Sequence, residues 1–189
     1  MEKITLEQGK IDGLLIFSPK VFADQRGCFL ESYNRDNFEQ LGFNEEFLQD
    51  NISYSNKNVI RGLHYQWDGG MGKLIQAVKG SLMDVAVDIR HGSPTFGQYE
   101  SVILSESNNK LFWVPPGFAH GFIALEHDTV AHYKCTAVYN DKAESGINPL
   151  DRDLDIDWGV NLNHTIISEK DVAAQSIEEY VEFPKFNYK

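Results

Sequence analysis

Short hydrophobic segments separated by polar and turn-forming residues dominate this chain and predict an all-β fold. Each segment is rich in apolar, β-branched or aromatic side chains, and Gly, Asn or Asp residues lie near many of the segment ends. The segments cover residues 14–17, 28–33, 73–78, 82–89, 98–104, 111–114, 121–125 and 129–138. Roughly eight to ten short strands at such spacing indicate a sandwich or a jelly roll.

Helical patterns are weak and predict only a few short helices beside the sheets. The fair candidates are residues 35–41 and 169–174, and Ser168 stands where the second helix would be capped. The Lys-Gly-Ser sequence at 79–81 predicts a tight hairpin turn between the strands that flank it. Without linkers or repeats, residues 1–189 are expected to form one domain, with a peripheral tail from about residue 177.

Composition excludes several classes of function. With 189 residues, 42% of them hydrophobic, the chain can bury a sizeable core, and no apolar run reaches the roughly 20 residues needed to cross a membrane. A net charge of −11 argues against nucleic acid as a partner, although a local cluster of cations could still hold a nucleotide. No secretory signal is visible, so the cytoplasm is the expected compartment, and Cys28 and Cys135 are expected to be buried thiols.

Two histidines in strand-like segments mark the first candidate chemistry. Residues 61–66 read Arg-Gly-Leu-His-Tyr-Gln, and residues 115–120 read Pro-Pro-Gly-Phe-Ala-His. Their spacing resembles the two halves of a double-stranded β-helix, the cupin-like jelly roll. Metal-binding members of that architecture usually carry His-x-His in the first half, where this chain has His64 and Gln66. The missing ligand predicts proton chemistry without a bound metal.

Each candidate side chain, taken alone, also has an ordinary structural explanation. A strand residue such as His64 or Tyr133 is more often a packing residue than a catalyst. Lys73 could be a solvated strand end, Asp171 a helix-capping acid and Arg26 a turn residue. Only the combination of these residues supports a function.

Ten ordered blocks between residues 21 and 171 carry a resemblance to one enzyme family. The blocks are residues 21–27, 29–33, 49–53, 58–66, 72–74, 84–90, 93–97, 116–122, 133–134 and 168–171. Together they resemble the dTDP-4-dehydrorhamnose 3,5-epimerases over nearly the whole chain. The resemblance implies a cupin-like jelly roll with a few short flanking helices.

The resemblance also implies a reaction, the conversion of dTDP-4-dehydro-6-deoxy-D-glucose into dTDP-4-dehydro-L-rhamnose. The C4 carbonyl of this sugar acidifies the hydrogens at C3 and C5, so no metal or organic cofactor is required. By the match, His64 is the base, Asp171 orients it, Lys73 stabilises the enolate oxygen and Tyr133 is the acid on the opposite face.

The remaining matched positions imply a substrate-binding set. Its members are Arg26, Arg61 and Lys170 for the diphosphate and nucleotide, Phe29 for the thymine, Glu31, Gln49 and Asn51 as polar contacts, His120 near the sugar, and Tyr139 and Glu144. Members of the family form homodimers that exchange N-terminal strands, so a partner chain is expected to supply part of the nucleotide site.

Alternatives stay open at the level of sequence. Residues 137–138 and 148–149 depart from the common family pattern, which leaves the exact sugar and nucleotide undecided. A mono-epimerase that inverts only C3 or only C5 of another nucleotide-linked 4-keto-6-deoxy sugar could keep the same base and acid. A 3,4-ketoisomerase would not be expected to keep all four catalytic residues. A metal-dependent dioxygenase would need more metal ligands than His64 and His120. A non-catalytic sugar-binding barrel would not explain why a base and an acid occur together.

Overall fold

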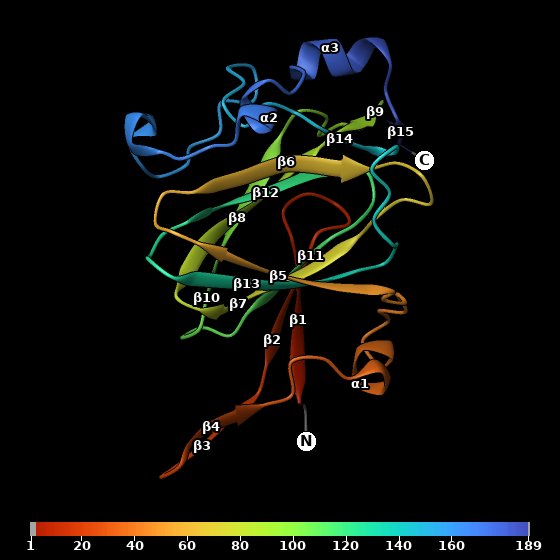
Figure 1. The fold of residues 1–189 in the computed structure, drawn as a ribbon. Helices are drawn as coiled ribbons and strands as arrows, with labels where there is room; N and C mark the ends of the chain where they lie inside the picture. Colours follow the sequence, from red (N-terminus) through yellow and green to blue (C-terminus); the bar gives the residue numbers. More distant parts are fainter. Residues whose placement is uncertain (1–2, 189) are drawn as a thin grey trace.

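Two antiparallel β-sheets face each other and form the body of the molecule, as the computed structural model shows for residues 3–188 (Figure 1). The larger sheet contains, in spatial order, β1 (Ile4–Gln8), β2 (Leu15–Pro19), β11 (Leu111–Val114), β7 (Lys73–Lys79), β13 (Thr129–Cys135) and β5 (Gln49–Ser55). The smaller sheet contains β10 (Tyr99–Ser105), β8 (Ser81–Asp88), β12 (Phe118–Ala124), β6 (Ile60–Gln66) and β14 (Glu144–Gly146). The predicted all-β, jelly-roll architecture is confirmed.

The remaining elements lie at the two ends of this body. Strands β3 (Val21–Asp24) and β4 (Gly27–Leu30) form a hairpin that projects away from the barrel (Figure 1). At the opposite end lie β9 (Arg90–His91), β15 (Phe186–Asn187), α2 (Glu169–Val172), α3 (Ile177–Glu182) and a 3-10 helix (Leu162–His164), whereas α1 (Arg35–Glu39) lies near the N-terminal strands. Within residues 3–188, no helix is long and apolar enough to cross a membrane.

Both faces of β8 and β12 in the smaller sheet are buried, which explains the nearly continuous apolar sequence of these two strands. Alternation along β8 sends Leu82 and Ala86 into the core between the sheets, together with Phe112 of the larger sheet. Met83 and Val85 point to the outer face, where the C-terminal segment covers them. Asp84 therefore shares the inner face with Ala86, an assignment that periodicity alone could not make.

The C-terminal segment is part of the core, so the expectation of a peripheral tail from about residue 177 is wrong for its helix. The side chains of Ile177 and Tyr180 in α3 are buried in the same cluster as Met83 and Val85. The Tyr180 ring packs edge-on against Tyr65 of β6, with 5.6 Å between ring centroids. Helix α3 begins with a capping box at Ser176, which fixes its start independently of the sheet.

Two further expectations need correction. Residues 79–81 do not form a hairpin, because β7 and β8 belong to different sheets and Gly80 carries the chain from one to the other. Gly80 has a φ of 68° and lies so close to Thr129 that a Cβ atom would approach its Oγ1 to 2.9 Å. Cys28 is exposed rather than buried, whereas Cys135 is buried, and both are free thiols.

A pair of glycines brings the two histidine-bearing strands together. A Cβ atom on Gly62 of β6 would lie 2.5 Å from the Cα of Gly121 in β12, so the backbones approach more closely than side chains would allow. The strand register shifts at this point, and His64 lies directly opposite His120. The close approach of the strands therefore sets the relative positions of the two imidazoles.

The packing of Tyr180 generates a stability prediction. Its hydroxyl accepts hydrogen bonds from the backbone N–H groups of Lys185 and Phe186, at 3.0 and 3.2 Å. Tyr180→Phe leaves these donors without an acceptor and should lower the free energy of unfolding by about 1–3 kcal/mol. Phe183→Ala, at a side chain that is 76% exposed, is the matched control and should change little in the same denaturant titration. An equal loss of unfolding free energy in the two variants would contradict a structural role for the Tyr180 hydroxyl.

Candidate active site

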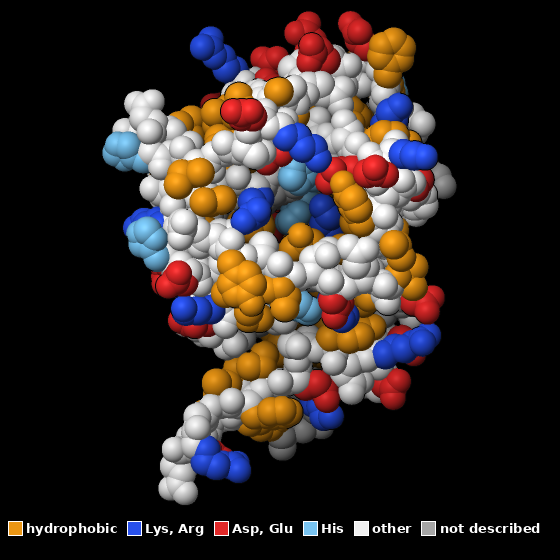
Figure 2. Space-filling view, viewed as in Figure 1, with side chains coloured by type: hydrophobic (Ala, Val, Ile, Leu, Met, Phe, Trp, Pro, Cys, Tyr) orange, Lys and Arg blue, Asp and Glu red, His pale blue; other side chains and the backbone are white. Residues whose placement is uncertain are grey.

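A cavity of about 610 Å³ opens between the two sheets, and eight of the sequence-predicted residues line it. These are Arg61, His64, Lys73, His120, Tyr133, Glu144, Lys170 and Asp171. Figure 2 shows histidine and basic side chains gathered in this hollow, although the chain as a whole is acidic. Residues from six strands and from α2 line the cavity, so the site depends on the complete barrel.

His64 and Asp171 form a hydrogen-bonded pair on one wall of the cavity. His64 Nε2 lies 2.7 Å from Asp171 Oδ1, and a carboxylate can only accept, so Nε2 donates and Nδ1 is left able to take up a proton. Ser168 caps α2 by accepting a hydrogen bond from the Asp171 backbone N–H, and this cap holds the carboxylate in place. The His64 side chain is 28% exposed against 7% for Asp171, so the imidazole is the group that a ligand can reach.

The surroundings of Asp171 favour its charged form. Burial raises the pKa of this carboxyl, but hydrogen bonding and attraction from His64, helped by the Gly62 and Ser168 contacts, outweigh burial and hold the pKa below its usual value. Asp171 is therefore an anion at neutral pH and accepts the hydrogen bond from His64 Nε2.

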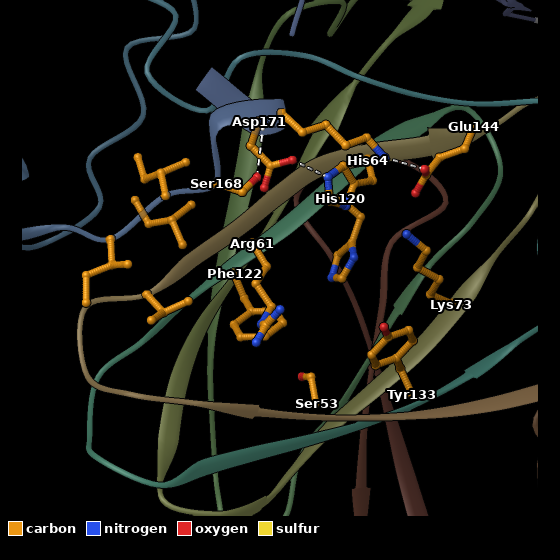
Figure 3. A pocket seen from close by; sticks show the side chains of 15 residues that line it. Ser53, Arg61, His64, Lys73, His120, Phe122, Tyr133, Glu144, Ser168 and Asp171 are labelled. Atoms are coloured by element: carbon orange, nitrogen blue, oxygen red, sulfur yellow. Dashed lines mark hydrogen bonds and ion pairs between the residues drawn. The ribbon is translucent and has the colours of Figure 1, made fainter. Parts of the chain in front are cut away.

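Lys73 and Tyr133 face this pair from the other wall of the cavity (Figure 3). They lie on the neighbouring strands β7 and β13 of the larger sheet. Burial lowers the pKa of Lys73, and its Nζ makes no hydrogen bond or ion pair within residues 3–188. Burial raises the pKa of Tyr133, which keeps the phenol protonated. The Lys73 amino group and the Tyr133 phenol are thus both available to a ligand.

Asp84 is a site residue that sequence reasoning missed. Its Oδ1 lies 2.8 Å from His120 Nε2, and both side chains are buried. Burial raises the pKa of Asp84, although the attraction of His120 opposes this shift. Burial also lowers the pKa of His120, although the attraction of Asp84 opposes that shift. A carboxylate in the apolar run at 82–89 was a usable signal, but only the structure places it beside a histidine of another strand.

A second group of charges lies at the mouth of the cavity. Lys170 Nζ donates to Glu144 Oε2 at 2.6 Å, and the Tyr139 hydroxyl donates to the same oxygen at 3.1 Å. Burial raises the pKa of Glu144, but Lys170 and His64 outweigh it and lower the pKa overall. Arg61 adds a further cation, positioned by hydrogen bonds to Ser55 Oγ and to the Tyr54 carbonyl, both at 3.0 Å.

Six predicted binding residues lie outside the cavity lining, and one of them, Tyr139, bonds to Glu144 at the cavity mouth. Arg26 and Phe29 belong to the projecting β3–β4 hairpin, and Glu31 follows it and bonds to Asn37. Gln49 and Asn51 lie on β5, where the Gln49 amide donates to Asn51 Oδ1 at 3.0 Å. Within one chain, the hairpin residues are thus separated from the catalytic candidates.

Ser53 is a second residue that sequence reasoning left without a role. It lies on β5 and lines the cavity floor near Tyr133 (Figure 3). Its hydroxyl is buried and has no hydrogen-bond partner among the described residues. Buried hydroxyls are normally satisfied, so this oxygen is available to a polar ligand.

The arrangement suits proton transfer at a carbon atom. Residues 3–188 contain no group of three or more His, Cys, Asp or Glu side chains placed to hold a metal ion. An imidazole lies on one wall, a phenol on the other, and the Lys73 amino group beside the phenol. A ligand carbonyl near Lys73 would have its neighbouring carbons between His64 and Tyr133, where a proton could leave one face and return on the other.

Comparison with known proteins agrees with this geometry. The family model described as dTDP-4-dehydrorhamnose 3,5-epimerase matches residues 8–179. An enzyme of that name from Shigella flexneri is 46% identical over 168 residues, which cover 88% of this chain and 92% of the relative.

Solved structures give the same result. The epimerase of Legionella pneumophila, in complex with dTDP-4-keto-L-rhamnose, is 43% identical, has a TM-score of 0.93 and covers 98% of this chain and 99% of its own. A 3'-monoepimerase from Streptomyces bikiniensis, in complex with dTDP-quinovose, is 30% identical, has a TM-score of 0.88 and covers 94% and 90%. The chain belongs to the dTDP-4-dehydrorhamnose 3,5-epimerase family.

Proposed function

We propose that this protein inverts C3 and C5 of dTDP-4-dehydro-6-deoxy-D-glucose to form dTDP-4-dehydro-L-rhamnose. The single observation that carries the proposal is the placement of His64 and Tyr133 on opposite walls of one cavity, with Lys73 beside Tyr133. A similar epimerase binds dTDP-4-keto-L-rhamnose, which supports the same sugar here.

His64 starts each inversion by removing a proton from the carbon next to the C4 carbonyl. The C–H electron pair moves into the C3–C4 or C4–C5 bond, and the carbonyl oxygen becomes an enolate oxygen beside the Lys73 ammonium. The enolate carbon then takes a proton from the Tyr133 phenol on the other face, which restores the ketone. The imidazolium that forms is stabilised by Asp171, whose carboxylate lies 2.7 Å away.

The substrate's own ketone holds the electron pair, so the proposed reaction needs no metal or organic cofactor. Tyr133 recovers its proton and His64 releases one before the next inversion, so each turnover leaves the enzyme unchanged. The Asp84–His120 pair supplies a buried imidazole next to His64 for a sugar hydroxyl or carbonyl. Lys170 and Arg61, which line the cavity, would bind the diphosphate through their positive charges.

We also propose a homodimer in which each β3–β4 hairpin completes the nucleotide site of the other subunit. In the hairpin, the Phe22 and Phe29 side chains are 47% and 69% exposed. Large exposed apolar side chains that lie together often mark a protein–protein contact. Ile52 and Tyr54 of β5 are exposed by 58% and 71% on the outer face of the larger sheet. Figure 2 shows apolar side chains both on the hairpin and over β5. A second copy that covers both surfaces would bring Arg26 and Phe29 to a nucleotide.

The runner-up is inversion at one carbon only. The similar 3'-monoepimerase supports this alternative, because its fold and its ligand class are the same. Small differences in the way the sugar ring sits would decide which carbons reach His64. The cytoplasmic location expected from the sequence stays a prediction.

Deuterium exchange tests the reaction directly. Wild-type protein incubated in D2O with dTDP-4-keto-6-deoxy-D-glucose should introduce deuterium at both C3 and C5, as followed by NMR. His64→Ala should abolish exchange at both carbons, because the base is gone. Exchange at one carbon would assign the mono-epimerase, and no exchange by folded, dTDP-binding wild type would reject the proposed function.

Asp171→Asn tests the pair that positions the base. The amide cannot stabilise the imidazolium, so kcat should fall by about 10²- to 10⁴-fold. Circular dichroism and the melting temperature at neutral pH verify that the variant is folded. Because the folded-state pKa of Asp171 is depressed, its stabilising effect is present at neutral pH and is lost as pH falls through that pKa. The variant should therefore lose less stability than wild type below about pH 4.

Mixed dimers test whether the hairpin acts in trans. Arg26→Ala impairs the hairpin and His64→Ala the cavity, so each variant alone should be weak at low substrate concentration. In a dimer of one copy of each, one site combines an intact cavity with an intact hairpin. Random mixing by co-expression should restore about one quarter of wild-type activity. Activity no higher than the mean of the two variants would show that the hairpin does not act in trans.

A further inference from the structure

Three consecutive residues beside the cavity mouth are held by glutamine side chains from both sheets. We call residues 138–140 the strap. It follows the larger sheet after β13 and carries Tyr139, whose hydroxyl bonds to the cavity-lining Glu144. The strap lies outside regular secondary structure, so side-chain contacts must fix its position.

Gln66 of β6 holds the two ends of the strap. Its Nε2 donates to the Val138 carbonyl at 3.0 Å, and its Oε1 accepts from the Asn140 backbone N–H at 2.9 Å. The side chain is 4% exposed and shares the cavity face of β6 with His64. Both polar ends of this buried amide thus form hydrogen bonds to the residues that flank Tyr139.

Gln49 of β5 holds the middle of the strap from the other sheet. Its Oε1 accepts from the Tyr139 backbone N–H at 2.9 Å, while its Nε2 donates to Asn51. The sequence match implied a nucleotide contact for Gln49, but in the structure both ends of its amide bond within the chain. The two glutamines therefore fix three successive backbone groups between the walls of the barrel.

The position of the strap determines a chain of contacts at the mouth. Tyr139 donates to Glu144, and the same Glu144 oxygen accepts from Lys170 at 2.6 Å. Glu144 also lies opposite Gln66 in the β14–β6 register. Gln66 is therefore linked to Glu144 in two ways, through its hydrogen bonds to the strap and through the pairing of β6 with β14.

We propose that Gln66 is a positioning residue for substrate binding, which holds the strap so that Tyr139 and Glu144 present Lys170 to the diphosphate. The inference rests on the proposed function in one respect, that Lys170 contacts the diphosphate. Gln66 touches no reacting atom in this scheme, so its loss should weaken binding and leave proton transfer nearly intact. An amide that only filled space would affect stability instead.

Gln66→Leu in the full-length protein separates the two roles. The KM for the 4-keto sugar nucleotide and the Kd for dTDP should both rise by about 10-fold or more, with kcat within about 3-fold of wild type. Gln175→Leu is the matched control, because the Gln175 amide donates to the Tyr65 hydroxyl at 2.8 Å on the opposite side of β6 and does not contact the strap. It should lower the melting temperature as much as Gln66→Leu while KM and Kd stay unchanged.

Gln66→Glu adds a signature that a packing role would not produce. A carboxylate can still accept from Asn140 but repels the Val138 carbonyl, whereas the protonated acid can donate to it. The dTDP affinity of this variant, relative to wild type at the same pH, should therefore recover as pH falls.

Three outcomes decide the proposal. Weaker dTDP binding by Gln66→Leu, without the same effect in Gln175→Leu, supports it even if wild type fails to exchange C3 and C5 and the epimerase reaction is rejected. Unchanged KM and Kd in Gln66→Leu, with only a lower melting temperature, overturn it and leave the proposed function standing. Failure of wild type to bind dTDP overturns both.

Discussion

The burial of charged side chains between the two sheets is the constraint on which the rest of this structure depends. Lys73, Asp84 and His120 lie inside a barrel whose neighbouring residues are largely apolar, and burial disfavours the charged form of each. Such groups are costly unless they are paired, and Asp84 with His120 is one such pair. The apolar contacts on both faces of β8 and β12 offset this cost. Burial also lowers the local dielectric, so a positive charge on Lys73 would act more strongly on a developing enolate than it would in water.

The site is assembled from segments that are far apart in sequence, and the contacts between these segments fix the relative positions of its side chains. Asp171 reaches His64 across 107 positions in the chain, and its helix has only four residues. A helix this short has little stability of its own, so the Ser168 cap and the packing of the C-terminal segment must hold it. The outer layer of the smaller sheet therefore supports both the core and the geometry of the base.

Alternation and turn residues predicted the strands and the short helices because those signals are local. They could not show that Gly80 joins two sheets, since a glycine with positive φ serves a hairpin and a crossing between sheets equally well. The tail was misjudged because Ile177 and Tyr180 are buried against β6 and β8, a contact that no local pattern reveals. The family resemblance located eight cavity residues, whereas Asp84 was missed because periodicity gives the face of a side chain but not the register between strands.

Gln66 shows how one residue can separate two kinds of barrel chemistry. A histidine at this position would point into the cavity beside His64, as in the metal-binding members of the architecture. An amide of similar reach binds metal weakly but has a donor and an acceptor, and here both bond to the backbone around Tyr139. Asp171 and Asp84 each bond to one of the cavity histidines, so we expect His64 and His120 to act in proton transfer and hydrogen bonding. Gln66 thus fills the position of a ligand in those members and holds the strap at the mouth of the cavity.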